Sequence, residues 1–234
     1  RITGVPDLGN DVSYETLRAQ IGSMFNTSTG QDRTVSFLGT FRYGYKDRYI
    51  LNFNYRADGA DAIGDAVLQE YRNLAQGNSK VKAIGEIGLD YHYEDVPRQQ
   101  QILCFREQMA LARELDLPVI IHEREAHEDA LQVLADFPQV TGVFHCYSGS
   151  AEMARRLVSQ GWYIGFTGVI TFKNARKLVE TAMAIPLDRM VIETDCPYMA
   201  PEPFRGRRND PGYVYRMSEK LAELRGISPE EMQK

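Results

Sequence analysis

The sequence predicts an α/β fold in which parallel strands alternate with helices, and two observations support this. Four short runs rich in Val and Ile have the length and apolar character of buried parallel strands, and a fifth run of similar length lies among them. The runs cover residues 81–86, 118–122, 141–145, 162–166 and 189–195. Segments with helical periodicity separate them. This order is typical of a TIM-type (β/α)8 barrel, so we expect a partial barrel with about five of the eight βα units.

An antiparallel β-hairpin is expected before these runs. Apolar and polar residues alternate over residues 35–45 and again over 49–56, and Lys46 and Asp47 form the turn between them. The stretch 43–59 resembles strands of SusC-like TonB-dependent outer-membrane transporters, which also alternate and end in aromatic residues. We therefore expect residues 1–58 to be a foreign, transporter-like hairpin segment, and residues 59–234 to be a separate domain.

Helices follow from the periodicity of the remaining segments. In residues 62–75, Ile63, Val67, Tyr71 and Leu74 recur on one face, which predicts an amphipathic helix. Further helices are expected at residues 14–23, 97–115, 126–136, 150–160, 173–184 and 211–225. A capping signal at Ser228 predicts one more.

Composition limits the classes of function. The 234 residues suffice for one barrel-sized unit or two smaller domains. The net charge of −5 gives no general argument for nucleic-acid binding, so contact with a polyanion needs a local basic patch or a metal ion. Three cysteines at spacings unlike zinc or redox motifs favour a reducing, cytoplasmic compartment. No run approaches the roughly 20 apolar residues of a membrane helix.

Four of the predicted strands end in residue types that bind metals: Glu86, His122, His145 and Asp195. Taken singly, each is more commonly a hydrogen-bonded polar residue at a strand end. Together they would meet at the C-terminal face of a barrel, where active sites lie. A carboxylate can bridge two divalent cations, and two imidazoles leave coordination positions open for water and substrate. The four residues therefore predict a metal site.

The motifs around these residues resemble those of TatD-type deoxyribonucleases, a family of the metal-dependent hydrolase (amidohydrolase) superfamily. The motifs are AIGEIGLDY at 83–91, PVIIH at 118–122, FHCYSG at 144–149, IETDCPY at 192–198 and RGRRNDP at 205–211. The resemblance covers about residues 60–234. It implies a barrel enzyme that hydrolyses phosphodiester bonds of DNA with a metal-activated water. It also implies one or two divalent ions per chain, with Mg²⁺ favoured and Mn²⁺ or Zn²⁺ as alternatives.

The resemblance also implies roles for individual residues. Glu86 would bridge two metal ions, His122 and His145 would hold one of them, and Asp195 would help to hold the other. Asp195 and Glu86 are the expected catalytic residues, with Asp195 taking the proton of the attacking water.

Substrate contacts are expected from four further residues. By the resemblance, Arg205 and Asn209 would lie at the phosphate-binding rim. Arg124 would steer a phosphate or form an exposed salt bridge, and Tyr91 would stack on a base or pack against its neighbours. The expected partner is DNA, with single strands or 3′ ends favoured. No stable protein partner is expected, and no membrane for residues 59–234.

One departure from the family pattern concerns its first strand, which ends in a His-x-His pair. The histidines here are His92, His122, His127 and His145, and none forms such a pair. We therefore expect a barrel truncated at both ends. Two alternatives remain open: a hydrolase of amides, esters or lactones from the same superfamily, and a non-enzymatic chimeric fragment carrying a transporter piece.

Overall fold

The computed structural model describes residues 35–43, 49–57, 63–93 and 96–232. By its internal contacts the chain divides into two units, Arg1–Thr34 and Val35–Lys234, and every described residue belongs to the second. The helix expected at 14–23, the turn at 46–47 and the proposed domain boundary near 59 lie outside the described residues. The division into two domains therefore stays a prediction.

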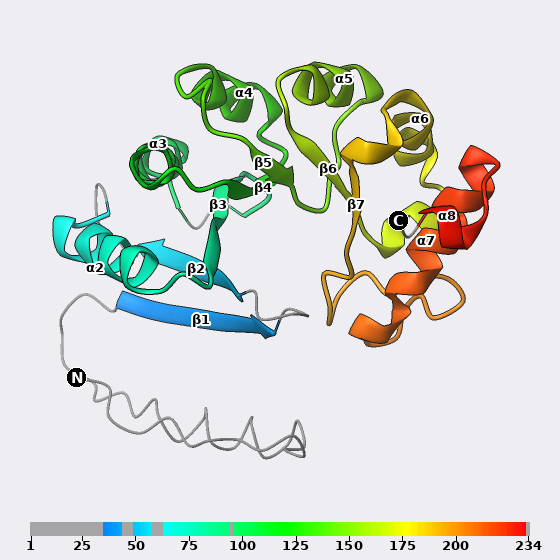
Figure 1. The fold of residues 1–234 in the computed structure, drawn as a ribbon, viewed down its shortest axis with the longest axis horizontal. Coiled ribbons are helices and arrows are strands. Elements are labelled where there is room, and N and C mark those ends of the chain that lie inside the picture. Colours follow the sequence, from blue (N-terminus) through cyan, green and yellow to red (C-terminus); the bar gives the residue numbers. More distant parts are fainter. Residues whose placement is uncertain (1–34, 44–48, 58–62, 94–95, 233–234) are drawn as a thin grey trace, which may run out of the picture. The chain divides into compact units, whose positions relative to one another are not determined.

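A single seven-stranded sheet runs through this unit in the order β1 to β7 (Figure 1). The strands are β1 Val35–Tyr43, β2 Tyr49–Ala57, β3 Val81–Asp90, β4 Val119–Arg124, β5 Gly142–Phe144, β6 Tyr163–Phe166 and β7 Met190–Ile192. The predicted hairpin is present, because β1 and β2 pair antiparallel. All later neighbours pair parallel, including β2 with β3, so the hairpin continues the sheet.

Helices connect the parallel strands from β3 onward. The α-helices are α2 Asp65–Gly77, α3 Arg98–Leu115, α4 His127–Ala135, α5 Ala151–Ser159, α6 Arg176–Ala184, α7 Val214–Arg225 and α8 Pro229–Met232. Short 3₁₀ turns are η1 Gly168–Thr171, η2 Leu187–Arg189 and η3 Pro211–Tyr213. Helices α3 to α6 lie along one side of the strands from β3 to β7 (Figure 1). The predicted α/β fold with five parallel strands of a partial barrel is confirmed.

The core lies between these strands and the helices. Fully buried side chains come from both layers, among them Phe105 and Met109 of α3 and Ile121 of β4. Phe144 of β5 packs edge-on against Trp162, with ring centroids 5.3 Å apart. Each such side chain contributes about 1.5–3 kcal/mol by leaving water. The core thus fixes the positions of the strands that carry the predicted metal ligands.

Two of the predicted strands continue past the ends that we expect for them. Strand β3 continues past Glu86 to Asp90, so Glu86 lies inside the strand and not at its end. Glycine explains the continuation: a Cβ at Gly88 would lie 2.0 Å from the carbonyl oxygen of His122, so only glycine lets β3 run this close to β4. His122 also lies within its strand, because pairing continues to Arg124.

Strand β7 is shorter than the predicted run of 189–195. It ends at Ile192, and Asp195 has a left-handed backbone with φ 50°. The carbonyl of Thr194 accepts a hydrogen bond from the Asn209 side chain at 2.6 Å. This carbonyl therefore bonds to a loop residue and not to a neighbouring strand. Asp195 therefore lies in the loop that follows the strand.

Candidate metal centre

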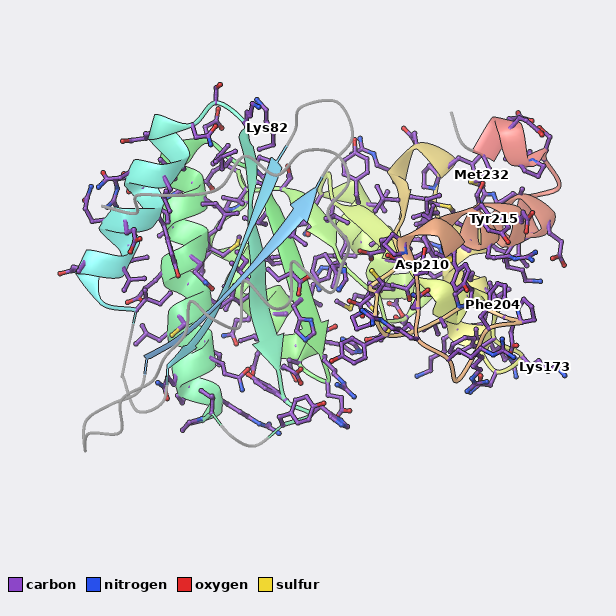
Figure 2. The ribbon with its side chains drawn as sticks, turned by 90° about the horizontal axis from the view of Figure 1, so that it is seen from below. Lys82, Lys173, Phe204, Asp210, Tyr215 and Met232 are labelled. Atoms are coloured by element: carbon purple, nitrogen blue, oxygen red, sulfur yellow. The ribbon has the colours of Figure 1, made fainter. Side chains whose placement is uncertain are left out.

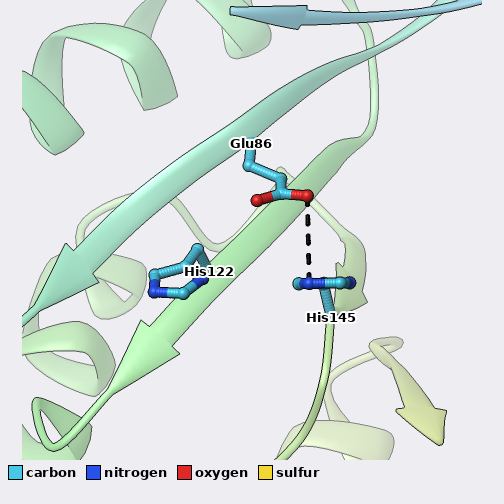
Figure 3. Close-up of side chains that lie close together, drawn as sticks. All are labelled: Glu86, His122 and His145. Carbon is cyan, nitrogen blue, oxygen red and sulfur yellow. Dashed lines mark ion pairs between the residues drawn. The ribbon is translucent and has the colours of Figure 1, made fainter. Parts of the chain in front are cut away.

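Three of the four predicted ligands meet at one point. Glu86 from β3, His122 from β4 and His145 from the residue after β5 each place a ligand atom within 4.8 Å of the others (Figure 3). His145 is buried, whereas Glu86 and His122 are partly exposed. The cluster is therefore open to solvent on one side and closed on the other.

Asp195 stands beside this cluster. The Nε2 atom of His145 lies 3.5 Å from Oδ1 of Asp195 and 3.8 Å from Oε1 of Glu86. Two ligand atoms that bind the same cation, each at about 2.0–2.2 Å from it, lie roughly 3.0–3.5 Å from one another. The observed separations are close to this range, and nitrogen and carboxylate oxygen are suitable donors for a divalent metal. The residues present therefore fit a metal ion.

His145 is surrounded by carboxylates. Its Nδ1 atom lies 2.5 Å from Oε2 of Glu193, on the side of the ring away from Glu86 and Asp195. Burial lowers the pKa of His145, but hydrogen bonds with Asp195 and Glu193 and the charges of Glu193 and Glu86 outweigh it and raise the pKa to about 10. Without a metal, the three carboxylates thus favour a protonated imidazole.

His122 has a carboxylate partner of its own. Its Nε2 atom lies 3.1 Å from Oδ2 of Asp90, the last residue of β3. The other carboxylate oxygen of Asp90 accepts a hydrogen bond from the backbone N–H of His92 at 2.9 Å. Asp90 therefore organises the loop after β3 and also contacts a predicted ligand.

Asn209 is buried, and its side chain is occupied by backbone groups. Its Nδ2 atom donates to the carbonyl oxygens of Thr194 and Tyr198, both at 2.6 Å. Its Oδ1 atom accepts from the backbone N–H of Asp210 at 2.9 Å. Asn209 thus holds the loop that carries Asp195, and its direct contact with substrate stays a prediction.

Tyr91 and Arg124 both have aromatic or polar neighbours. The Tyr91 hydroxyl donates to Asp129 at 2.6 Å, and the guanidinium of Arg98 lies 4.4 Å from the ring centroid. Burial and this hydrogen bond raise the pKa of Tyr91 above its ordinary value. Arg124 lies 5.4 Å from the ring centroid of Tyr93. Of the two alternatives for Tyr91, stacking on a base or packing against its neighbours, the observed contacts correspond to packing.

Arg205 lies in the segment between β7 and α7, next to η1. Its guanidinium lies 4.2 Å from the ring centroid of Phe172, and the backbone N–H of Glu202 donates to Thr171 at 2.8 Å. Phe204 and Asp210 of the same segment are labelled in Figure 2. Lys173, Arg205 and Arg207 are all exposed here, and we refer to these three residues as the basic rim.

Two carboxylates that contact predicted ligands were not among the residues predicted for the site. Glu193 and Asp90 each pair with one histidine of the cluster. Glu193 stands two residues before Asp195 in the motif 192–198, and Asp90 lies near the end of the motif 83–91. Their positions within the same motifs as the ligands were the available signal, but their partners follow only from the fold.

A partial barrel with two histidines and a carboxylate gathered in or directly after neighbouring strands is typical of the class of barrel metal hydrolases. The family model described as "TatD related DNase" matches residues 10–234. The chain therefore belongs to the TatD-related family. The resemblance of residues 43–59 to SusC-like transporters is not supported, since the matched region spans the hairpin.

Individual relatives agree with this assignment. The uncharacterized metal-dependent hydrolase YabD of Bacillus subtilis (strain 168) is 45% identical over 188 residues, which are 77% of this chain and 73% of that protein. The uncharacterized metal-dependent hydrolase YcfH of Escherichia coli (strain K12) is 41% identical over 168 residues, 70% of this chain and 63% of that protein. The chain thus spans roughly two thirds to three quarters of these relatives.

Solved structures show the same fold. The crystal structure of YjjV, a TatD homologue from Escherichia coli K12, matches with a TM-score of 0.67 and 36% identity, over 73% of this chain and 66% of that one. A TatD family hydrolase from Entamoeba histolytica matches with a TM-score of 0.63 and 27% identity, over 72% of this chain and 65% of that one. Within the part of the chain that the structure describes, no helix is long and apolar enough to span a membrane.

Proposed function

We propose that this chain is a divalent-metal-dependent phosphodiesterase that acts on DNA. The observation that carries the proposal is the convergence of Glu86, His122 and His145, with Asp195 beside them. The basic rim includes Arg205 and Arg207, which follow Asp195 by ten and twelve residues in the sequence. The three cysteines of the chain are free, which is compatible with the reducing, cytoplasmic location that we propose.

Glu86, His122 and His145 are the residues that would hold the cation. When bound, a divalent ion withdraws charge from the scissile phosphate and lowers the pKa of water. Oxygen and imidazole ligands admit Mg²⁺, Mn²⁺ and Zn²⁺. Mg²⁺ is the ion favoured by the family resemblance, and the other two belong in any test.

Asp195 is the proposed proton acceptor. Its side chain is 23% exposed, so solvent and substrate can reach it, while His145 behind it is 4% exposed. The left-handed backbone of Asp195 and the anchoring of the preceding residue by Asn209 hold the carboxylate at the edge of the cluster. A fixed carboxylate within reach of the reacting water is the requirement for a general base.

The basic rim favours a polyanion over a neutral substrate. The chain as a whole carries a charge of −5, so Lys173, Arg205 and Arg207 are a local departure from it. Such charges strengthen the binding of nucleic-acid phosphates, whereas they do not strengthen the binding of a neutral amide or lactone. Tyr198 is 70% exposed, three residues after Asp195, and an exposed aromatic ring can stack on an unpaired base. These features support single-stranded DNA as substrate, and the preference for 3′ ends stays a prediction from the family resemblance.

The test compares substrates under one set of metal conditions. Purified chain is incubated with Mg²⁺, Mn²⁺ or Zn²⁺ and a labelled single-stranded oligonucleotide, the matching duplex, or a neutral aryl ester or lactone. We expect metal-dependent cleavage of the single strand, and loss of it in Glu86→Ala and Asp195→Asn. Hydrolysis of the neutral ester or lactone without cleavage of DNA would assign the chain to carbonyl chemistry instead.

A further inference from the structure

We propose that Glu193 is a positioning residue that fixes the orientation and the protonated nitrogen of His145, and that it thereby sets the metal affinity of the centre. The inference rests on the proposed metal centre. It assigns a function to a carboxylate that is not among the predicted ligands.

Glu193 is itself held in place by the sheet. It directly follows β7, and its backbone N–H donates to the carbonyl oxygen of Phe166 at 3.1 Å. Its carboxylate then contacts two consecutive residues: Oε2 lies 2.5 Å from Nδ1 of His145, and Oε1 accepts from the backbone N–H of Cys146 at 2.6 Å. One side chain therefore fixes both the ring and the backbone beside it.

The structure keeps a space for this carboxylate. Gly165 lies beside it on β6, and a Cβ at that position would come within 2.2 Å of Oε1 of Glu193 and 2.9 Å of the carbonyl oxygen of Phe144. Any side chain at residue 165 would displace Glu193. Glycine is thus required here by the carboxylate of Glu193 first and by the backbone of β5 second.

Cys146 supplies independent support. It has a left-handed backbone with φ 46°, an unfavourable conformation for a residue with a Cβ. Such a conformation persists only where the surroundings hold it, and the hydrogen bond from its N–H to Glu193 does so. The turn after His145 is therefore shaped around the carboxylate.

The consequence concerns which nitrogen of His145 is free. A neutral imidazole carries one proton, and a carboxylate at Nδ1 keeps the proton there. Nε2 then keeps its lone pair, and this is the atom that faces Glu86 and Asp195. Glu193 contacts Nδ1, whereas Glu86 and Asp195 face Nε2, so Glu193 acts through His145 and not as a ligand.

The central test is Glu193→Gln, measured by calorimetric titration with Zn²⁺ or Mn²⁺ alone. Glutamine keeps the size, but it cannot accept from both N–H groups, because one of its two terminal atoms is itself a donor. We expect an affinity about 10–100-fold below wild type. Gly165→Ala, which displaces Glu193 and also presses on the carbonyl of Phe144, should weaken binding in the same direction. Glu180→Gln, an exposed carboxylate on α6, is the matched control and should bind as wild type does.

A second measurement reads the tautomer directly. Nitrogen NMR of the Zn²⁺-loaded wild type should show His145 coordinated through Nε2 with a proton on Nδ1. A purely structural role for Glu193 would leave this pattern unchanged in Glu193→Gln, whereas we expect mixed coordination. Coordination through Nδ1 in the wild type would overturn the proposal, even if the variant failed to fold.

The outcomes distinguish the positioning role of Glu193 from the metal centre on which it depends. If Glu193→Gln binds metal as tightly as wild type while His145→Ala does not bind, the positioning role is wrong and the metal centre stands. If the wild type binds no divalent ion, the metal centre is wrong and the role of Glu193 falls with it.

Discussion

Oε1 of Glu86 lies 3.8 Å from Nε2 of His145, although the two residues come from β3 and from the loop after β5. This separation is too long for a hydrogen bond and close to that of two atoms sharing a cation. The other ring nitrogen of His145, Nδ1, contacts the carboxylate of Glu193. Two groups held at this spacing suit a shared cation better than a direct ion pair.

The first prediction follows from this pair. Replacing Glu86 with alanine removes the only carboxylate of the three-residue cluster, so we expect metal affinity to fall at least about 100-fold, beyond the effect of losing an outer partner. Calorimetric titration with Mn²⁺ measures it. Glu152→Ala, a change in the first turn of α5, is the control. Undiminished binding by Glu86→Ala would exclude it as a ligand.

The second prediction concerns pH and the metal-free chain. The pKa of His145 is about 10 in the folded state and ordinarily about 6.5, so the folded state binds the extra proton between these values. Its stabilising contribution is complete below about pH 6.5 and is lost as pH rises toward 10. We expect the free energy of unfolding to decrease across this window, measured by urea denaturation at several pH values.

A variant isolates the histidine from other titrating groups. Burial also raises the pKa of Cys104 to about 11, and this thiol contributes in the same direction at the alkaline end. His145→Gln should therefore reduce the slope without abolishing it. An unchanged slope in His145→Gln would show that the proton is bound elsewhere. Saturating metal should also flatten the slope, since it competes with the proton for His145.

The order of elements could be predicted from the sequence because buried parallel strands and amphipathic helices leave different periodicities. The hairpin at 35–57 and the alternation from β3 to β7 follow from local patterns alone. Strand ends were harder to predict. The polar residues Glu86 and His122 suggested an end, but strand pairing continues where the glycines of β3 allow close approach to β4.

The site was predictable in its ligand types and not in its supporting contacts. Glu86, His122 and His145 do come together, as residue type and motif predict, although Glu86 and His122 lie within their strands and Asp195 lies in the loop after β7. The pairing of Glu193 with His145 joins residues 48 positions apart in sequence, and no local pattern encodes such a contact. The same holds for Asn209, whose amide group is used by backbone carbonyls of a loop that only the fold brings near.

The third prediction tests that loop. Asn209→Ala leaves the carbonyls of Thr194 and Tyr198 without their donor, so we expect a loss of about 1–3 kcal/mol in the free energy of unfolding. Since the loop carries Asp195, activity should fall further than stability explains. Denaturation and single-turnover rates measure the two effects. Asn174→Ala, an exposed change after η1, should alter neither. Equal losses in both variants would contradict the anchoring role.

The fourth prediction concerns the core beneath the site. Phe144 is 1% exposed, packs edge-on against Trp162 and Tyr147, and precedes His145 directly. Phe144→Ala should cost about 3–5 kcal/mol of stability through lost burial and the cavity left behind. Tyr163→Ala, at a 39% exposed position on β6, should cost clearly less. Similar midpoints of urea unfolding for the two variants would disprove this placement of the core.

The fifth prediction separates a charged substrate from a neutral one. If Arg205 neutralises a DNA phosphate, its removal should weaken binding of a single strand. The slope of log affinity against log salt should then become shallower by about 0.7 for each phosphate that is no longer neutralised. Arg205 lies over Phe172, so its guanidinium is held in place before substrate arrives. Fluorescence anisotropy with a labelled oligonucleotide, at four salt concentrations and in the presence of Ca²⁺, measures the slope without turnover.

Arg176→Ala is the matched control, because Arg176 is equally cationic and exposed but pairs with Glu180 on the same helix. We expect wild-type and Arg176→Ala slopes to coincide and the Arg205→Ala slope to be shallower. Lys173→Ala and Arg207→Ala should each act in the same direction as Arg205→Ala, since both belong to the basic rim. Parallel slopes for wild type and all three rim variants would remove the rim from the binding surface. In that case the support for a polyanionic substrate would depend on the metal cluster alone.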